Sequence, residues 1–151
     1  MALIAEDLFT TFAERVVMRV DAVDANQGCK WPLSEAQRTV LRLLRCRQGR
    51  DKAIPLGELC ERMKVTPRIV KDIVQDLRLN FGIQIGASRD STAGGYYLIA
   101  NEAESVESTT QMLHQALTML EVVRVMRGHH TILDMLGQAH LKFDKEKADE
   151  A

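Results

Sequence analysis

The sequence predicts a mainly α-helical protein with a small β wing. Three observations predict this class. A helix has a clear start at Thr66 and Pro67, where a capping residue precedes a proline. Two short apolar segments, 83–85 and 96–99, have the composition of strands and enclose a polar loop that ends in glycine. Long helical patterns lie on both sides of this segment, so we expect a core flanked by long N- and C-terminal helices.

The helix expected over 66–79 has an apolar face and a polar face. The Thr66 hydroxyl can accept from a backbone N–H of the first turn, and Pro67 needs no hydrogen-bond partner at the first helical position. Gly82 is expected to end the helix. The apolar face comprises Ile69, Val70, Ile73, Val74 and Leu77. The polar face carries Arg68, Lys71, Asp72, Gln75, Asp76 and Arg78.

Two more helices are expected before this one. One covers 56–63 and is joined to it by a tight turn. The other starts at Ser34, where Ser34 and Gln37 fit a capping box. Ala53 and Ile54 are expected to add a short strand that pairs with the strand over 96–99. A helix, a turn, a second helix and a two-stranded wing at 83–99 together make a winged helix-turn-helix core.

Three parts of this segment carry a resemblance to a known family. They are the stretch 56–78, the step Phe81-Gly82-Ile83 and the return strand Gly94-Gly95-Tyr96-Tyr97-Leu98. On these residues, 33–99 resembles the winged-helix family of the DNA-binding domain of the biotin operon repressor. Small phage and prophage winged-helix proteins are similar over a longer span that includes a helical tail. The resemblance implies a sequence-specific, duplex DNA-binding transcription regulator; ligase activity is not implied, because the family's enzymatic domain needs a much longer chain.

In this interpretation the recognition helix 66–79 enters the major groove. Arg68 and Lys71 can read guanine, and Gln75 can read adenine with two hydrogen bonds. Asp72 can accept from cytosine N4, or it can pair with a neighbouring cation and weaken that cation's contact with DNA. Arg89 at the tip of the wing can reach the backbone or the minor groove. Phosphate contacts are expected from Lys64, Thr66 and Arg78.

The net charge of -1 conceals an uneven distribution. Residues 34–99 hold 12 Lys and Arg against 7 Asp and Glu, a net of +5, whereas the rest of the chain has a net of -6. A basic excess around the expected DNA-binding helices suits contact with phosphate, although a chance imbalance on a solvated surface would give the same count. The same two interpretations apply to the arginines that follow Ser34, which are Arg38, Arg42, Arg45, Arg47 and Arg50.

Three regions are expected. Residues 1–32 form an amphipathic helix over 2–23 and a linker, and Trp31 and Leu33, which flank this break in the helical pattern, are expected to anchor it to the core. Residues 33–100 form the winged-helix domain. Residues 101–151 form a helical oligomerisation region, with one helix to about 127, a short helix over 131–143 and a frayed charged tail.

The two flanking helices show more apolar surface than one chain obviously needs, and this predicts a homo-oligomer, most simply a dimer. A two-fold dimer would present two recognition helices to half-sites about 34 Å apart. The alternative is that the two helices pack on each other within one chain. The residues expected at the oligomer contact are Phe9, Phe12, Val16, Leu113, Leu117, Leu120 and Val123.

The sequence lacks the motifs of known catalytic and phosphate-binding sites, and its four histidines and three cysteines have no metal-ligand spacing. We therefore expect no enzyme activity, no cofactor and no metal. Acidic Glu6 and Asp7 near the N-terminus and the absence of a long apolar run predict a cytoplasmic protein that does not enter a membrane. The alternative function is a protein-interaction module on a winged-helix scaffold, and it is favoured if the exposed face of 67–78 is covered by a partner.

Overall fold

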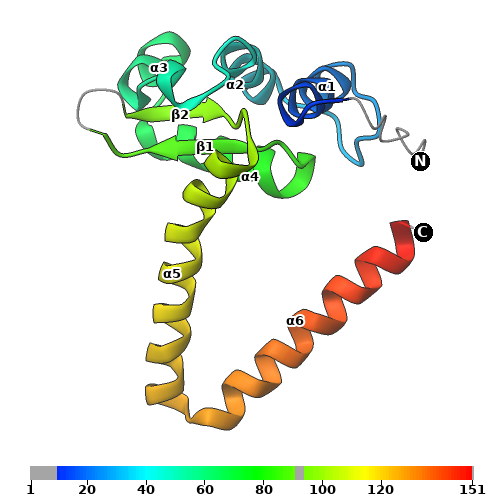
Figure 1. Cartoon of the computed structure of the whole chain (residues 1–151), viewed down its shortest axis with the longest axis vertical. Helices are drawn as coiled ribbons and strands as arrows, with labels where there is room; N and C mark the ends of the chain where they lie inside the picture. Colours follow the sequence, from blue (N-terminus) through cyan, green and yellow to red (C-terminus); the bar gives the residue numbers. More distant parts are fainter. Residues whose placement is uncertain (1–9, 91–93, 151) are drawn as a thin grey trace. The chain divides into compact units, whose positions relative to one another are not determined.

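The computed structural model describes residues 10–90 and 94–150, with side chains described as far as 139. It is mainly helical with one small antiparallel sheet, as the sequence predicts. The chain divides into two compact units, one reaching to Ser108 and the other beginning at Thr109 (Figure 1). In chain order the elements are α1 (Phe12–Asp24), α2 (Glu35–Arg45), η1 (Arg50–Lys52), α3 (Leu56–Met63), α4 (Pro67–Phe81), β1 (Ile85–Ser88), β2 (Gly95–Leu98), α5 (Glu102–Arg127) and α6 (His129–Glu150).

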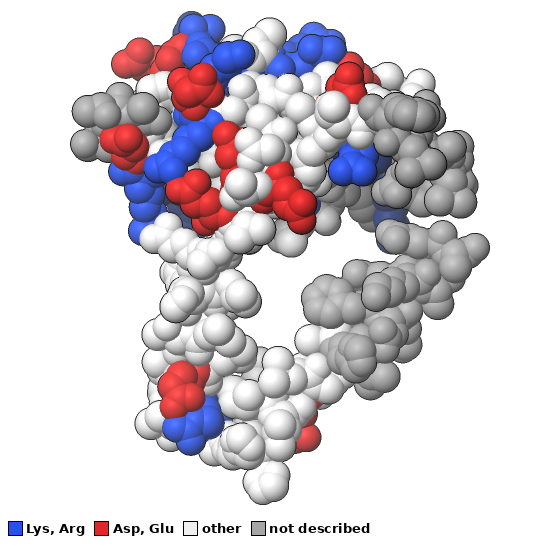
Figure 2. Space-filling view, in the orientation of Figure 1, with Lys and Arg blue, Asp and Glu red and all other residues white. Residues whose placement is uncertain are grey.

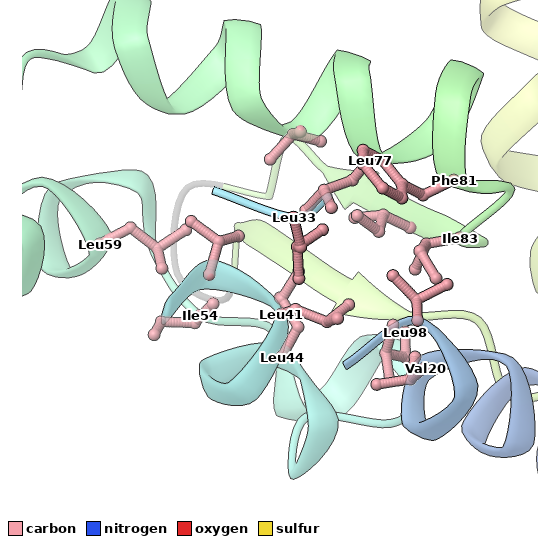
Figure 3. Close-up of a cluster of buried hydrophobic side chains, with 14 of the residues drawn as sticks. Val20, Leu33, Leu41, Leu44, Ile54, Leu59, Leu77, Phe81, Ile83 and Leu98 are labelled. Carbon is pink, nitrogen blue, oxygen red and sulfur yellow. The ribbon is translucent and has the colours of Figure 1, made fainter. Parts of the chain in front are cut away.

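A single hydrophobic core fills the first unit. In Figure 3 the buried side chains lie between α4 on one side and α2 on the other, with the two strands passing among them. Helix α2 begins at the expected cap, because Ser34 and Gln37 form both hydrogen bonds of a capping box. The core residues labelled in the figure are Val20, Leu33, Leu41, Leu44, Ile54, Leu59, Leu77, Phe81, Ile83 and Leu98.

Strands β1 and β2 pair in register from Ile85 with Leu98 to Ser88 with Gly95. The expected third segment is present as a bridge, in which Ile54 and Tyr96 exchange hydrogen bonds of 2.8 and 2.9 Å. The first strand begins later than the expected 83–85. Ile83 is buried instead, and its N–H donates to the carbonyl of Leu77 at 3.1 Å, which completes the end of α4.

Helix α1 begins at Phe12, whereas the sequence predicted a helix over 2–23; residues 2–9 lie outside the described chain. Thr11 and Glu14 form a capping box, which sets the start of the helix. The apolar periodicity continues before Thr11 and therefore predicted an earlier start. Val20 and Val23 are buried in the common core, and Arg19 Nε donates to the carbonyl of Phe81 at 2.9 Å. The described part of 1–32 therefore belongs to the same compact unit as α2–α4.

Trp31 is 61% exposed, so the expectation that it anchors the linker to the core is wrong. Its ring faces outward with the Lys30 ammonium 5.8 Å from the ring centroid. The neighbouring Leu33 supplies the anchor, since it is buried in the core.

The C-terminal helices follow the expected division but not the expected lengths. Helix α5 ends at Arg127, and Gly128 has a φ of +94° that breaks the helical path. Helix α6 then continues to Glu150, so most of the predicted frayed tail is helical. The physical reason is that residues 144–150 contain neither proline nor glycine and are mostly good helix formers.

Candidate nucleic-acid interface

Helices α3 and α4 are joined by three residues, Lys64, Val65 and Thr66. Lys64 takes the left-handed conformation with a φ of +54°, and the Val65 N–H donates to the carbonyl of Cys60 at 3.2 Å. Thr66 and Pro67 occupy the N-cap and first helical position, as predicted. The predicted hydroxyl cap is absent, because the Thr66 side chain makes no capping hydrogen bond. Residues 66–69 are exposed, so solvent reaches the N–H groups of this first turn.

Helix α4 presents three different sides. Val70, Val74, Leu77 and Phe81 form its buried side. On one flank, Asp76 accepts hydrogen bonds from the side chains of Gln37 and Asn80, which ties this flank to the start of α2.

On the other flank of α4, Arg78 Nε donates to the carbonyl of Ile85 at 2.9 Å, which ties that flank to β1. At 100° per residue, Arg68, Lys71 and Gln75 project outward between the buried side and the side of Asp72. They lie toward the β1 flank and form one stripe along the first turns of α4.

The structure places most of the predicted DNA-contact residues on the surface. Seven are exposed, namely Lys64, Thr66, Arg68, Lys71, Asp72, Gln75 and Arg89. Within the described ranges, Lys64, Arg68, Lys71 and Arg89 form no ion pair. Asp72 likewise pairs with neither Arg68 nor Lys71, so the two cations remain open to a ligand.

Arg78 is the exception, because it is partly buried and its guanidinium is already engaged by the protein. Burial lowers the pKa of its guanidinium, and one of its terminal nitrogens is enclosed by protein. Burial raises the pKa of the Tyr96 phenol in β2, and the nearby charge of Arg78 opposes that rise. Arg78 therefore links α4 to β1 and is less available to a ligand than the exposed cations of the helix. The sequence periodicity could not reveal this, because Arg78 lies at the edge of the polar face.

Ile69 also departs from its predicted place, since it is 44% exposed instead of facing the core. At 100° per residue it lies on the far side of Val70 from the β1 flank, beside Asp72 and Asp76. Leu79 is a second exposed apolar residue on the same helix.

The arginines of α2 and its exit all have acidic partners. Asp24 of α1 accepts from Arg38 at 2.8 Å and from Arg42 at 3.3 Å. Asp21 binds Arg45 in a two-pronged contact of 2.5 and 2.8 Å, and this hydrogen bond raises the pKa of the Arg45 guanidinium. The remaining two pairs are Arg47 with Glu58 and Arg50 with Glu107. The structure therefore agrees with neither interpretation of these arginines. They are not free to contact phosphate, and they do not form a simple solvated face, because each has an acidic partner.

These ion pairs, with the acidic residues on either side of 34–99, change what the net charge of +5 over that segment indicates. Residues 10–108 hold 15 Lys and Arg against 13 Asp and Glu, so α1 and the start of α5 remove most of the local excess. Figure 2 shows acidic and basic surfaces side by side over this unit. Sequence reasoning missed Asp21 and Asp24. The available signal was their spacing of three on one helix, which complements the spacing of Arg38, Arg42 and Arg45 on the next.

The predicted oligomer residues fall into three groups. Phe9 lies outside the described residues. Phe12 packs partly against the core, and Val16 is only 4% exposed within it, so Val16 lacks the free surface that a contact with another chain requires. On α5, Leu113 and Leu117 are 60% and 56% exposed, and Leu120 and Val123 are half-buried.

In the described part of the chain, no group of His, Cys, Asp and Glu could hold a metal ion, and no helix there has the length and apolar character needed to cross a membrane. All three cysteines are unpaired. Comparisons with protein-family models, with curated proteins and with solved structures found no match.

Proposed function

We propose that this chain is a sequence-specific DNA-binding transcription regulator, with α2–α4 and the β1–β2 hairpin acting as a winged helix-turn-helix. One contrast supports the proposal. The arginines of α2 each have an acidic partner, whereas Lys64, Arg68 and Lys71 are exposed and unpaired in the described chain. An unpaired surface cation can bind phosphate or a base edge without first breaking an ion pair, so these three residues offer DNA a group of available cations at the start of α4.

The residues of this surface suit different contacts. Arg68 and Gln75 lie along one outward stripe in the first half of α4, the part of a recognition helix that reaches base edges. Lys64 in the preceding turn suits a phosphate, and so do the uncapped N–H groups that follow Thr66. Unpaired Asp72 can accept from cytosine N4 and would oppose binding where no such donor is present. Arg89 supplies a cation beside the wing.

The test is a salt titration of binding to random duplex DNA. The natural protein should bind at low salt, and its affinity should fall steeply as salt rises, because each phosphate contact contributes a slope of about -0.9 in log affinity against log salt. The double variant Arg68→Gln/Lys71→Gln should bind more weakly with a shallower slope. Arg42→Gln/Arg45→Gln removes the same charge from arginines that are already paired, and it should change the slope little.

Two outcomes of this titration contradict the proposal. One is that the folded natural protein shows no binding at low salt. The other is that both double variants lose affinity equally, which would mean that net charge and not the α4 surface determines binding.

An interaction module remains the alternative function, and exposed Ile69 and Leu79 on α4 favour it. Exposed apolar side chains on α4 would suit a protein partner as well as the methyl group of thymine. The same titration separates the two functions, because a module that uses α4 for a protein partner need not bind DNA at low salt.

A further inference from the structure

One line of residues runs along the whole of α5 with spacings of four and three in strict alternation. This spacing keeps residues on one face of a helix, as in a coiled coil. The inner six residues are uncharged, and the two ends carry opposite charges. We call this line the α5 stripe; it consists of Glu102, Val106, Thr109, Leu113, Ala116, Leu120, Val123 and Arg127.

The centre of the α5 stripe faces solvent. Leu113 is 60% exposed, Ala116 is exposed, and residues 108–120 contain no Asp, Glu, Lys or Arg. In Figure 2 the described part of the unit that begins at Thr109 is mostly white on the face shown, that is, neither acidic nor basic. Over its described part, helix α6 makes no extensive contact with α5. Near their junction, however, Ile132 of α6 is buried, and Leu120 and Val123 of the stripe are half-buried. Apolar surface of this extent on a helix calls for a partner.

The ends of the stripe identify that partner. Glu102 and Arg127 are both exposed, and neither forms an ion pair with a described residue. They are separated by about 38 Å along one helix, at a rise of 1.5 Å per residue, so they cannot neutralise each other within one chain.

The alternation of four and three reads the same in both directions, so the stripe can align with an antiparallel copy of itself. We propose that the α5 stripe is the contact with a second copy of this chain, in an antiparallel pair related by a two-fold axis between Leu113 and Ala116. Glu102 then lies opposite Arg127 of the second copy at both ends of the pair. Val106 lies opposite Val123, and Leu113 lies opposite Ala116. A parallel pair would instead place Glu102 against Glu102 and Arg127 against Arg127, which like-charge repulsion disfavours.

This pairing can be tested without DNA, because it uses no residue of α4 or the wing. It is tested first by light scattering after gel filtration of the full chain at micromolar concentration. We expect a mass near twice the 17.0 kDa of one chain. A mass near 17.0 kDa throughout the concentration range would overturn the proposal, since the stripe would then be open or covered by a different partner.

Charge reversal tests the antiparallel register. Glu102→Arg and Arg127→Glu should each weaken dimerisation about tenfold, because each reversal acts at both ends of a two-fold pair. The double variant Glu102→Arg/Arg127→Glu should recover the natural affinity. The helix dipole cannot explain such recovery, since both reversals oppose the dipole and their effects on α5 itself would add. A double variant that dimerises no better than the single ones would overturn the antiparallel arrangement.

A matched pair of apolar variants tests the position of the face. Leu113→Glu places a carboxylate beside the proposed axis and should abolish the dimer at micromolar concentration. Val125→Glu makes the same chemical change on the opposite side of α5, where the side chain is also well exposed, and it should leave the dimer intact. Far-ultraviolet circular dichroism shows that each variant keeps its helices. Equal loss of the dimer in both variants, or no loss in Leu113→Glu, would overturn the proposal.

Discussion

Gly95 stands where the return strand passes the backbone of Ile54. It has a φ of +150°, and a Cβ at this position would lie 2.0 Å from the Ile54 carbonyl oxygen. That oxygen accepts from the Tyr96 N–H at 2.9 Å, so neither backbone can withdraw without breaking the bridge. The glycine is therefore required both by its conformation and by the closeness of the two chains.

A substitution at Gly95 should destabilise the fold. Gly95→Ala is expected to lower the free energy of unfolding by about 1–3 kcal/mol, because the side chain meets backbone atoms in a conformation that alanine rarely adopts. The matched control is Gly57→Ala in α3, where a Cβ meets nothing within 4 Å. This substitution should raise the free energy of unfolding by about 0.5–1 kcal/mol, because alanine favours the helix over glycine. Urea unfolding of both variants measures the difference. Equal effects at the two positions would show that the close approach of Gly95 does not limit stability.

Arg78 shows what a helical wheel leaves out at the residue scale. Its position in the sequence suits a solvent-exposed cation, yet its Nε donates to the carbonyl of Ile85 and one of its terminal nitrogens is enclosed. Only the packing of β1 against α4 determines that outcome. Arg68 was easier to predict, because it lies near the centre of the exposed side of α4, away from the elements that pack against the helix.

At the scale of elements, the ends of helices with local signals were predictable. Ser34 and Gln37 cap α2 as the sequence predicts, and Gly82 ends α4 in the left-handed conformation. The start of α1 was missed although Thr11 and Glu14 also form a capping box, because the apolar repeat continues toward the N-terminus and favoured an earlier start. Capping residues therefore predict a helix end well when the apolar repeat of the helix does not continue past that end.

The contacts between elements could not be read from the sequence in the same way. Five arginines on α2 and its exit looked like a basic face, and only the placement of α1 beside α2 showed Asp21 and Asp24 to be partners of three of them. Exposed ion pairs of this kind contribute little to stability. Their larger effect is on the potential that DNA meets, because they neutralise the side of the unit formed by α1 and α2.

The double variant Asp21→Asn/Asp24→Asn should therefore strengthen non-specific DNA binding. It frees the arginines of α2, so affinity for random duplex DNA should rise and the salt dependence should become steeper. Thermal stability should fall only modestly, since the Arg42–Asp24 and Arg45–Asp21 pairs are largely exposed and only the Arg38–Asp24 pair is partly buried. The control is Glu121→Gln, which frees Arg124 on α5 and should leave DNA binding unchanged. An unchanged affinity in the Asp21 and Asp24 variant would mean that α2 does not approach DNA.

At the scale of the whole molecule, the two proposed roles, DNA binding and pairing with a second copy, are assigned mainly to different compact units. Almost all buried hydrophobic residues of the described chain precede Ser108, with Ile132 as the exception. The first unit thus contains its own core, and it retains the hydrogen bond of 3.0 Å between the hydroxyls of Tyr97 and Ser108. Most of the α5 stripe lies in the second unit, so DNA contact and pairing are assigned to different parts of the chain.

A chain that ends at Ser108 should separate these two roles. It should unfold cooperatively, because its core is complete, and it should have the mass of a monomer, because it lacks the stripe from Thr109 to Arg127. Its affinity for random duplex DNA should fall, and the slope of log affinity against log salt should be about half that of the full chain, since one copy and not two would release counterions. Light scattering and a salt titration of the shortened and full chains measure both properties. A shortened chain that remains a dimer would place the contact between copies before Thr109, and a monomer with an unchanged slope would show that the full chain binds DNA through one copy.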